Sequence, residues 1–233
     1  MAGERSQGKR SPGTLYIVGL PIGNPEDITL RALRLLRQAD VIATKEPQQT
    51  QALLRRHRIR ALITTYDRRN APSKIPILMH YLRTGSTVML VSNAGTPCLY
   101  DPGFRLVAHA HRAGIPIVSV PGPSALTAAL AVAGMSGDTL CFHGRFPAAE
   151  IGGKRLLRSI KAHGGTSIFF VWPERLRKIL MLAENVLGNR DTLIAVDLTK
   201  PTERLLRGKI RNLLGKYPLD YPDTEVTLVV AGR

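Results

Sequence analysis

Residues 14–36, TLYIVGLPIGNPEDITLRALRLL, decide the fold, because they hold a strand, a turn and a helix in that order. The apolar run at 14–20 is typical of a buried strand, and glycines and a proline break it at 19–24. From 27 to 38, leucines alternate with arginines, which predicts a helix with one apolar and one basic face. Repeats of such a unit build a mostly parallel sheet.

The same alternation extends along the chain and is divided by Pro-Gly-Pro at 121–123. Before this sequence, further strands are expected at 40–44, 87–92 and 116–120, and helices at 49–57, 73–82 and 103–112. After it, a helix of small residues is expected at 123–135, strands at 139–142, 167–172, 192–198 and 226–231, and helices at 154–162 and 174–187. Because prolines stop a strand sharply, we expect a flexible basic leader at 1–12, an N-terminal α/β domain at 13–121 and a C-terminal α/β domain at 122–233.

The charge of the chain points to a polyanionic partner. Its 233 residues include 33 Lys and Arg against 17 Asp and Glu, a net charge of +16, while a hydrophobic content of 44% is ordinary for a folded protein. Residues 31–69 carry ten basic side chains against three acidic ones, and 150–216 carry fourteen against six. The densest run, RRHRIR, makes Arg55, Arg56 and Arg58 candidate RNA contacts. A merely solvated surface is the alternative.

Several other classes of protein are disfavoured. Two cysteines, Cys98 and Cys141, are too few for a disulfide framework, so a reducing, cytoplasmic setting is expected. No apolar stretch approaches the roughly 20 residues that span a bilayer, so no membrane partner is expected. No metal is expected either, because His109 and His111 are two apart on a predicted helix and face different directions.

Three loops with small residues follow predicted strands of the first sheet. They contain Leu20, Pro21, Ile22 and Gly23, then Asn93, Ala94, Gly95 and Thr96, then Gly122, Ser124 and Ala125. Open α/β sheets bind ligands at the carboxyl ends of their strands, so these loops are expected to converge on one site. Their backbone groups can bond an adenosine or amino-acid moiety. Valine at Gly95 or Gly122 should then block binding and spare the fold.

The same loops carry a resemblance to a known family. PIGNPEDITLRAL at 21–33, SNAGTP at 92–97 with DPG at 101–103, and PGPSAL at 121–126 resemble the signature loops of the tetrapyrrole methylase superfamily. Within it, the chain is most similar to the bacterial branch that methylates a cytidine ribose 2′-hydroxyl of small-subunit ribosomal RNA. The similarity continues through GRFPA at 144–148, DLTK at 197–200 and TEVTLVVAG at 224–232.

The resemblance implies a two-domain α/β fold, with a mostly parallel N-terminal sheet, a mixed C-terminal sheet and S-adenosylmethionine in the cleft between them. It also implies a homodimer that acts on ribosomal RNA or on the small ribosomal subunit. Carried over to this sequence, the residues that line the cofactor are Leu20, Pro21, Ile22, Gly23, Asn93, Ala94, Gly95, Thr96, Gly122, Ser124 and Ala125.

Acidic positions of the family are replaced here. Asn93 stands where the family usually has Asp, and Lys45-Glu46-Pro47-Gln48 stands where this branch typically has Glu-Asp-Thr-Arg. His143 occupies a position that is often Glu. Glu46 is therefore the first candidate for the base that accepts the hydroxyl proton, and His143 the second, although a structural role is the stronger expectation for His143.

Two other side chains are weaker candidates. Asp67 could also serve as a base, but beside Arg68 and Arg69 it is expected to form a surface ion pair. Trp172 could stack on a base or on adenine, but a single Trp in the run FFVW is expected to lie in the core.

Two alternative functions stay open. One is methylation of a corrin or porphyrin precursor on the same fold. The other is a catalytically impaired paralogue that binds S-adenosylmethionine or RNA without turnover, which the replaced acidic positions would explain.

Overall fold

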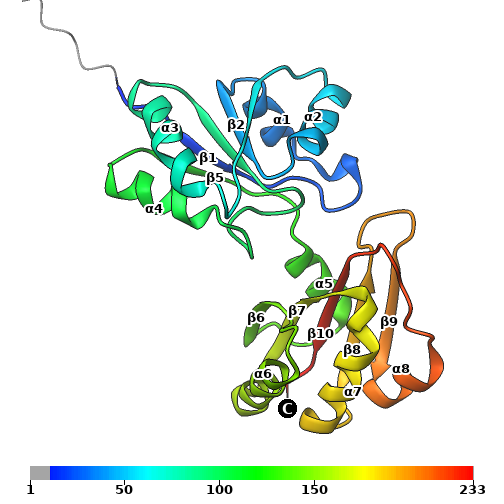
Figure 1. The fold of residues 1–233 in the computed structure, drawn as a ribbon. Helices are drawn as coiled ribbons and strands as arrows, with labels where there is room; N and C mark the ends of the chain where they lie inside the picture. The colour runs from blue at the N-terminus through cyan, green and yellow to red at the C-terminus, as the bar shows by residue number, and fades with distance from the viewer. Residues whose placement is uncertain (1–10, 233) are drawn as a thin grey trace, which may run out of the picture. The chain divides into compact units, whose positions relative to one another are not determined.

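The computed structural model describes residues 11–232, so most of the leader expected at 1–12 lies outside the described residues. The chain divides into two compact units (Figure 1). The first unit contains residues 11–21 and Pro25–Pro123, and the second contains Ile22–Asn24 and the chain from Ser124 onward. Each unit is one sheet with helices on both faces, as expected for an α/β protein.

The first unit has a five-stranded sheet in the order β3-β2-β4-β1-β5. Its strands are β1 (Leu15–Val18), β2 (Val41–Thr44), β3 (Leu62–Thr65), β4 (Val88–Val91) and β5 (Ile117–Val120). Every pairing is parallel, which confirms the predicted sheet type. Strand β3 was not predicted, because as an edge strand it is partly exposed and lacks a continuous apolar run.

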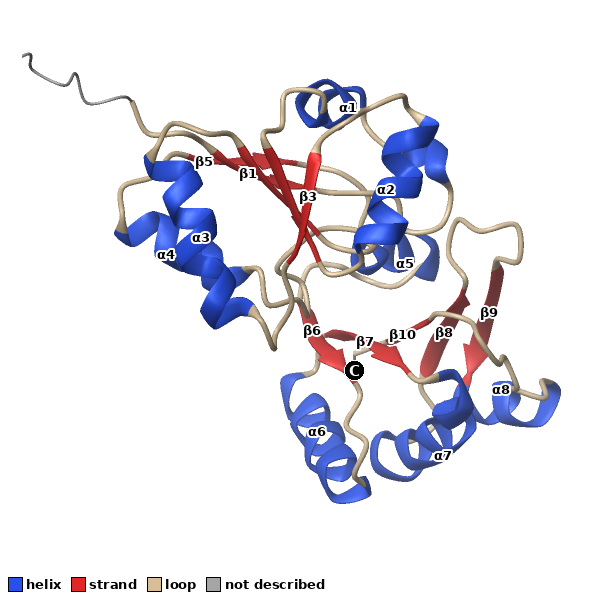
Figure 2. Cartoon of the chain, turned by 45° about the horizontal axis from the view of Figure 1, so that its top comes forward, coloured by secondary structure: helices blue, strands red, loops and turns tan. Residues whose placement is uncertain are grey.

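Two helices cover each face of this sheet (Figure 2). They are α1 (Leu30–Leu36) and α2 (Pro47–Arg56) on one face, and α3 (Ala71–Arg83) and α4 (Phe104–Arg112) on the other. The first helix begins at Leu30 and not at 27, because the Thr29 side chain accepts the Ala32 N–H at 3.1 Å and caps it. The preceding residues form a short 3-10 helix, η1 (Pro25–Asp27).

The second unit has a mixed five-stranded sheet in the order β6-β7-β10-β8-β9. Its strands are β6 (Leu140–Arg145), β7 (Thr166–Val171), β8 (Asp191–Val196), β9 (Arg204–Lys209) and β10 (Val226–Val230). Only the β6–β7 pairing is parallel. The expectation of a mixed second sheet is confirmed.

The helices of the second unit are divided unequally between the two faces of its sheet (Figure 2). Helix α5 (Ala125–Ala133) covers one face, where buried Ala129 and Ala133 allow close approach. The other face carries α6 (Glu150–His163), α7 (Leu176–Leu187) and α8 (Ile210–Lys216), with the 3-10 helix η2 (Pro173–Arg175) before α7. Among residues 11–232, no helix has both the length and the apolar character needed to cross a membrane.

Candidate functional site

The loops after β1 and β4 are joined backbone to backbone in the first unit. Leu20 N–H donates to the Gly95 carbonyl, and Gly95 N–H donates to the Leu20 carbonyl, both at 3.0 Å. This exchange is possible because β1 and β4 are adjacent parallel strands that end at the same edge. These two hydrogen bonds place the predicted cofactor residues 20–21 beside the predicted cofactor residues 93–96.

The loop after β5 contacts the loops after β1 and β4. Gly19 N–H donates to the Val120 carbonyl at 3.1 Å, and the Thr96 hydroxyl donates to the Pro123 carbonyl at 3.1 Å. The predicted convergence of three loops at one sheet edge is therefore confirmed. Seven predicted residues come together there: Leu20, Pro21, Asn93, Ala94, Gly95, Thr96 and Gly122.

The role expected for Gly122 is corrected by the backbone around it. A Cβ atom on Gly122 would lie 2.8 Å from the Gly19 carbonyl oxygen and 3.1 Å from the Gly19 Cα. The absent side chain thus makes room for another loop of the protein, and not for a ligand. The expectation that valine at this position spares the fold is wrong. Gly95 has a φ of +73°, so valine there would also strain the backbone.

Asn93 presents a polar atom that nothing in the described residues satisfies. Its Oδ1 is buried and has no hydrogen-bond partner within residues 11–232. The turn that carries Asn93 is held from inside, because the buried Ser92 hydroxyl lies 3.0 Å from the Ala94 carbonyl and 2.9 Å from the Gly95 carbonyl. Buried acceptors are nearly always paired in folded proteins, so this atom is suited to a donor on a ligand.

Four predicted cofactor residues belong to the second unit. Ile22 is buried in the core between α5 and the sheet, and Ala125 packs against the same cluster. Ser124 precedes α5, and its carbonyl accepts the Ala128 N–H at 2.9 Å. A Cβ atom on Gly23 would lie 2.5 Å from the Leu198 carbonyl oxygen. Ile22, Gly23, Ser124 and Ala125 therefore belong to the second unit, and the remaining seven predicted cofactor residues belong to the first.

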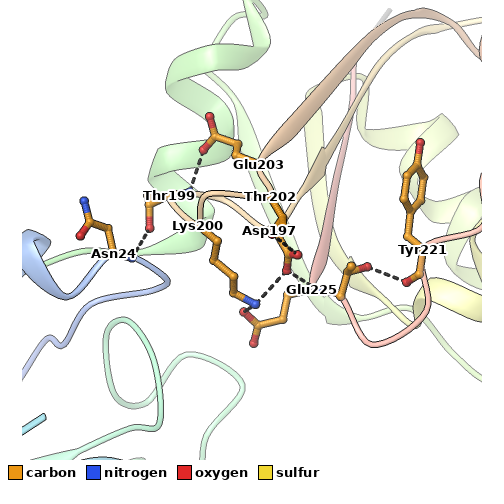
Figure 3. A network of polar contacts seen from close by, with 9 residues as sticks. Asn24, Asp197, Thr199, Lys200, Thr202, Glu203, Tyr221 and Glu225 are labelled. Atoms are coloured by element: carbon orange, nitrogen blue, oxygen red, sulfur yellow. Dashed lines mark hydrogen bonds and ion pairs between the residues drawn. The ribbon is translucent and has the colours of Figure 1, made fainter.

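A polar turn at residues 197–203, the Asp197 turn, holds the segment at 22–24 (Figure 3). Asn24 N–H donates to the Thr199 hydroxyl at 2.9 Å. Thr199 has a φ of +66°, a strained conformation for a β-branched residue, and its N–H donates to the Glu203 carboxylate at 2.7 Å. This arrangement was not predicted from the sequence, where only the run of polar residues after strand 192–198 hinted at it.

Asp197 is the centre of that turn. Its side chain is 7% exposed and accepts hydrogen bonds from Lys200 Nζ at 2.8 Å, the Thr202 hydroxyl at 2.8 Å and the Glu225 N–H at 3.1 Å. Burial by itself would raise the pKa of Asp197, but these hydrogen bonds and the Lys200 charge outweigh it and hold the pKa below the usual value. The pair with Lys200 therefore stays charged at neutral pH.

The two candidate bases lie in different units. Glu46 is half-buried and lies between β2 and α2. Because β2 is parallel to its neighbour β4, Glu46 lies at the same sheet edge as the three loops. His143 lies on β6, with Nε2 3.2 Å from the Ser167 hydroxyl and its ring 6.4 Å from that of Phe169. Phe169 belongs to the core beneath α6 and α7. Burial lowers the pKa of His143, and the charge of His163 lowers it further.

Two expectations about other side chains are wrong. The Asp67 carboxylate accepts the backbone N–H groups of Arg69 at 2.7 Å and Asn70 at 2.9 Å, so it closes the turn before α3 and does not pair with Arg68. Trp172 is 45% exposed and not in the core, because it follows the end of β7 and its ring lies under the Arg145 guanidinium at 3.8 Å.

The predicted RNA contacts Arg55, Arg56 and Arg58 are all exposed at the C-terminal end of α2, and we call them the helix-end patch. Cations are favourable at this end of a helix, so the patch has a structural advantage whatever it binds. Within residues 11–232, no group of three or more His, Cys, Asp or Glu side chains is placed to hold a metal ion.

Comparisons with known proteins find one family. The model of the tetrapyrrole (corrin/porphyrin) methylases matches residues 14–214. "Ribosomal RNA small subunit methyltransferase I" of Thermotoga maritima is 39% identical over 221 residues, 95% of this chain and 99% of that protein. The protein of the same name from Mesorhizobium japonicum is 41% identical over 220 residues, 93% of this chain and 74% of that protein.

A solved structure extends the likeness to the fold. Uroporphyrin-III C-methyltransferase from Thermus thermophilus, solved with S-adenyl homocysteine, has a TM-score of 0.65 and 23% identity, covering 93% of this chain and 97% of that one. At that identity the likeness concerns the fold alone. The match of the family model over most of the chain and the identity to full-length relatives show that this chain belongs to the tetrapyrrole methylase family.

Proposed function

We propose that this chain is an S-adenosylmethionine-dependent methyltransferase that methylates a ribose 2′-hydroxyl of small-subunit ribosomal RNA. The observation that carries the proposal is the meeting of three strand-end loops, one of which presents the unpaired buried acceptor of Asn93. Relatives that match almost the whole chain are named for methylation of ribosomal RNA. A net charge of +16, spread over two long regions, exceeds what a single small polyanionic tetrapyrrole needs and therefore favours RNA.

The loop residues fit the cofactor chemically. The methionine part of S-adenosylmethionine ends in a cationic amine, which is a hydrogen-bond donor, and Asn93 Oδ1 is an unpaired acceptor. Asparagine keeps this hydrogen bond but not the charge that an aspartate would add. We assign to the cofactor Leu20, Pro21, Ile22, Gly23, Asn93, Ala94, Gly95, Thr96, Ser124 and Ala125, and we leave out Gly122, whose missing side chain makes room for Gly19. When bound, the cofactor supplies a methyl group that its sulfonium already activates.

The protein then has two tasks. It aligns the ribose oxygen in line with the methyl group, and it accepts the proton that leaves the hydroxyl. Glu46 is our candidate for the acceptor, because its carboxylate is at the loop edge of the first sheet, and a positioned base contributes about 10²–10⁴-fold. His143 is the second candidate, since its lowered pKa keeps the imidazole neutral, but its contact with Ser167 favours a structural role.

The remaining assignments follow the family resemblance and the charge. We assign the helix-end patch to phosphate groups of ribosomal RNA or of the small ribosomal subunit. We also propose a homodimer in the cytoplasm. Light scattering on the purified chain tests the dimer, because a mass near the 25.5 kDa of one chain would exclude it.

The decisive experiment combines binding and transfer. Calorimetric titration measures the affinity for S-adenosylmethionine, and labelled cofactor measures methyl transfer to small ribosomal subunits, to their protein-free RNA and to a tetrapyrrole precursor. A 2′-O-methyl group blocks alkaline cleavage of the neighbouring phosphodiester, so the expected product is an alkali-resistant labelled dinucleotide. Transfer to the tetrapyrrole alone would replace the proposal with the corrin or porphyrin reading. Cofactor binding without any transfer would indicate an impaired paralogue.

The Glu46→Gln variant tests the proposed base. We expect kcat to fall about 10²-fold or more while the Kd for the cofactor stays unchanged, because only proton acceptance is removed. Asp220→Asn, at an exposed carboxylate of the second unit, is the matched control and should retain full activity. An unchanged kcat in Glu46→Gln would remove Glu46 from the mechanism.

A further inference from the structure

Trp172 is the only tryptophan of the chain, and its side chain lies on the surface of the second unit. It is 45% exposed, and the Arg145 guanidinium lies over its ring at 3.8 Å from the centroid. The guanidinium covers one face of the indole, and the residue still keeps nearly half of its surface exposed. An exposed indole with one covered face can accept one more planar group.

The backbone holds the Trp172–Arg145 pair in a fixed place. Trp172 follows β7, its carbonyl accepts the Arg175 N–H at 2.9 Å, and the next residue, Pro173, is buried. Arg145 ends β6, which is parallel to β7, so the two side chains come from neighbouring strands at the same edge. We call this pair the platform. Its backbone is fixed by these contacts before any ligand binds, which lowers the entropic cost of stacking.

The same edge of the second sheet carries the Asp197 turn. Val226, at the start of β10, pairs with Val171 on one side and with Val196 on the other. The ends of β6, β7 and β8 are thus aligned, and Trp172 shares its edge with the turn that holds residues 22–24. Ile22 and Gly23 are among the proposed cofactor contacts, so Trp172 lies at the same edge of the second sheet as the turn that holds them.

We propose that Trp172, covered on one face by Arg145, stacks on one unpaired nucleobase of the RNA substrate. This inference rests on the proposed function. Proteins recognise RNA mainly in single-stranded loops, where bases stack on aromatic rings and on arginine planes. With an aromatic content of only 5%, the chain has few rings to offer, so the platform takes a single base and not a run of bases. The Arg145 cation also favours a polyanion over a neutral ligand.

Because Trp172 is the only tryptophan, its fluorescence reports directly on this contact in the full-length protein. Titration with a short single-stranded oligoribonucleotide should quench the emission. The control is an oligomer of the same length without bases, which keeps the phosphate charges and should leave the emission unchanged. Equal quenching by both oligomers would overturn the proposal. Quenching by S-adenosylmethionine alone, with none by RNA, would also overturn it, because the stacked ring would then be the cofactor's adenine.

Variants test whether the contact contributes to affinity. Trp172→Ala should raise the Kd for the labelled oligoribonucleotide about 5-fold or more, whereas Trp172→Phe should retain most of the affinity. Phe104→Ala is the matched control, because Phe104 is 57% exposed and Arg105 lies near its ring at 5.9 Å. We expect the control to bind as the unmodified protein does. Equal decreases in affinity in Trp172→Ala and Phe104→Ala would refute a specific platform.

The two proposals can fail separately. If RNA quenches Trp172 but no methyl group is transferred to any RNA, the platform stands and the proposed function fails. If Trp172→Ala transfers methyl groups to RNA with unchanged KM and kcat, the proposed function stands and the platform fails.

Discussion

Replacing Asp197 by Asn removes one negative charge from the Asp197 turn and leaves the shape of the side chain unchanged. Asn tolerates the left-handed conformation, so the φ of +49° at this position adds no backbone penalty. The amide oxygen can keep the contacts with Lys200 Nζ and the Glu225 N–H, while the amide NH₂ can donate to the Thr202 hydroxyl. The variant therefore isolates the contribution of the charge.

The expected decrease in stability follows from the difference between charged and neutral hydrogen bonds. A hydrogen bond to a charged group contributes about 1.5–3 kcal/mol, and a neutral one about 0.5–1.5 kcal/mol. With Lys200 and Thr202 each at 2.8 Å, removing the charge assistance of two bonds lowers the free energy of unfolding by about 2 kcal/mol. For a chain of this length, that lowers Tm by roughly 4–8 °C.

Urea or thermal unfolding followed by Trp172 fluorescence measures this decrease, because Trp172 and Asp197 belong to the same unit. The decrease should depend on pH with a definite sign. The native pKa of Asp197 is below its unfolded value of 3.8, so the carboxylate stabilises the fold fully above that pH, and the contribution disappears as the pH falls through the native pKa. The gap between the variant and the unmodified protein should thus close at low pH.

Asp191→Asn is the control for this experiment. Asp191 is at the other end of β8 and contacts Lys209 at the same distance of 2.8 Å, but its side chain is 42% exposed. Solvent screens such a pair, so Asp191→Asn should leave the midpoint essentially unchanged. Equal shifts in the two variants, or a gap for Asp197→Asn that is the same at pH 7 and at about pH 3, would refute the reasoning.

Three further predictions test the first unit. Asn93→Ala should raise the Kd for S-adenosylmethionine roughly 10-fold or more, measured by calorimetry, and should not lower Tm without the cofactor, because it removes an unpaired acceptor. Gly122→Ala should lower the free energy of unfolding by about 1–3 kcal/mol, because its Cβ meets the Gly19 backbone; unchanged urea unfolding with abolished cofactor binding would restore a ligand role. Replacing all three arginines of the helix-end patch by Glu should weaken RNA binding, measured by fluorescence anisotropy. The slope of log K against log salt concentration should become flatter by about one unit for each phosphate that is no longer neutralised. An unaltered slope would mean that the patch is only solvated.

Periodicity was enough to predict four of the five strands in each sheet and most helices, because buried strands and amphipathic helices leave direct patterns in the sequence. The mostly exposed strand β9 and the short helix α8 were not predicted. Periodicity failed where tertiary contacts determine the conformation of a segment or the exposure of a side chain. Strand β3 is an exposed edge whose pairing with β2 gives it its conformation. Trp172 has the apolar neighbours of a core residue, yet the chain turns into η2 at the next residue and leaves the indole outside.

The convergence of the loops could be predicted because parallel strands all end at one sheet edge. The role of each glycine in these loops could not be predicted. A glycine is needed both where a ligand approaches the backbone closely and where a second loop does, and the sequence does not distinguish the two cases. Gly122 illustrates the ambiguity, because only the position of Gly19 shows which of the two fills the space. The Asp197 turn was missed for a related reason: its partners Asn24 and Glu225 are distant in sequence.

Features that no sequence pattern predicts are found in the loop after β4 and in the Asp197 turn, although not only there. Among the described residues, seven other than glycine have a positive φ, and four of them, Cys98, Tyr100, Asp197 and Thr199, lie in the loop after β4 or in the Asp197 turn. The unpaired acceptor of Asn93 belongs to the first of these loops. Strained backbone and unsatisfied polar atoms lower stability, so they persist where binding a ligand compensates for them. Because the cofactor binds the native state and not the unfolded one, S-adenosylmethionine should raise Tm by an amount that is set by its concentration relative to its Kd, and an unchanged Tm at saturating cofactor would contradict the assignment of these loops.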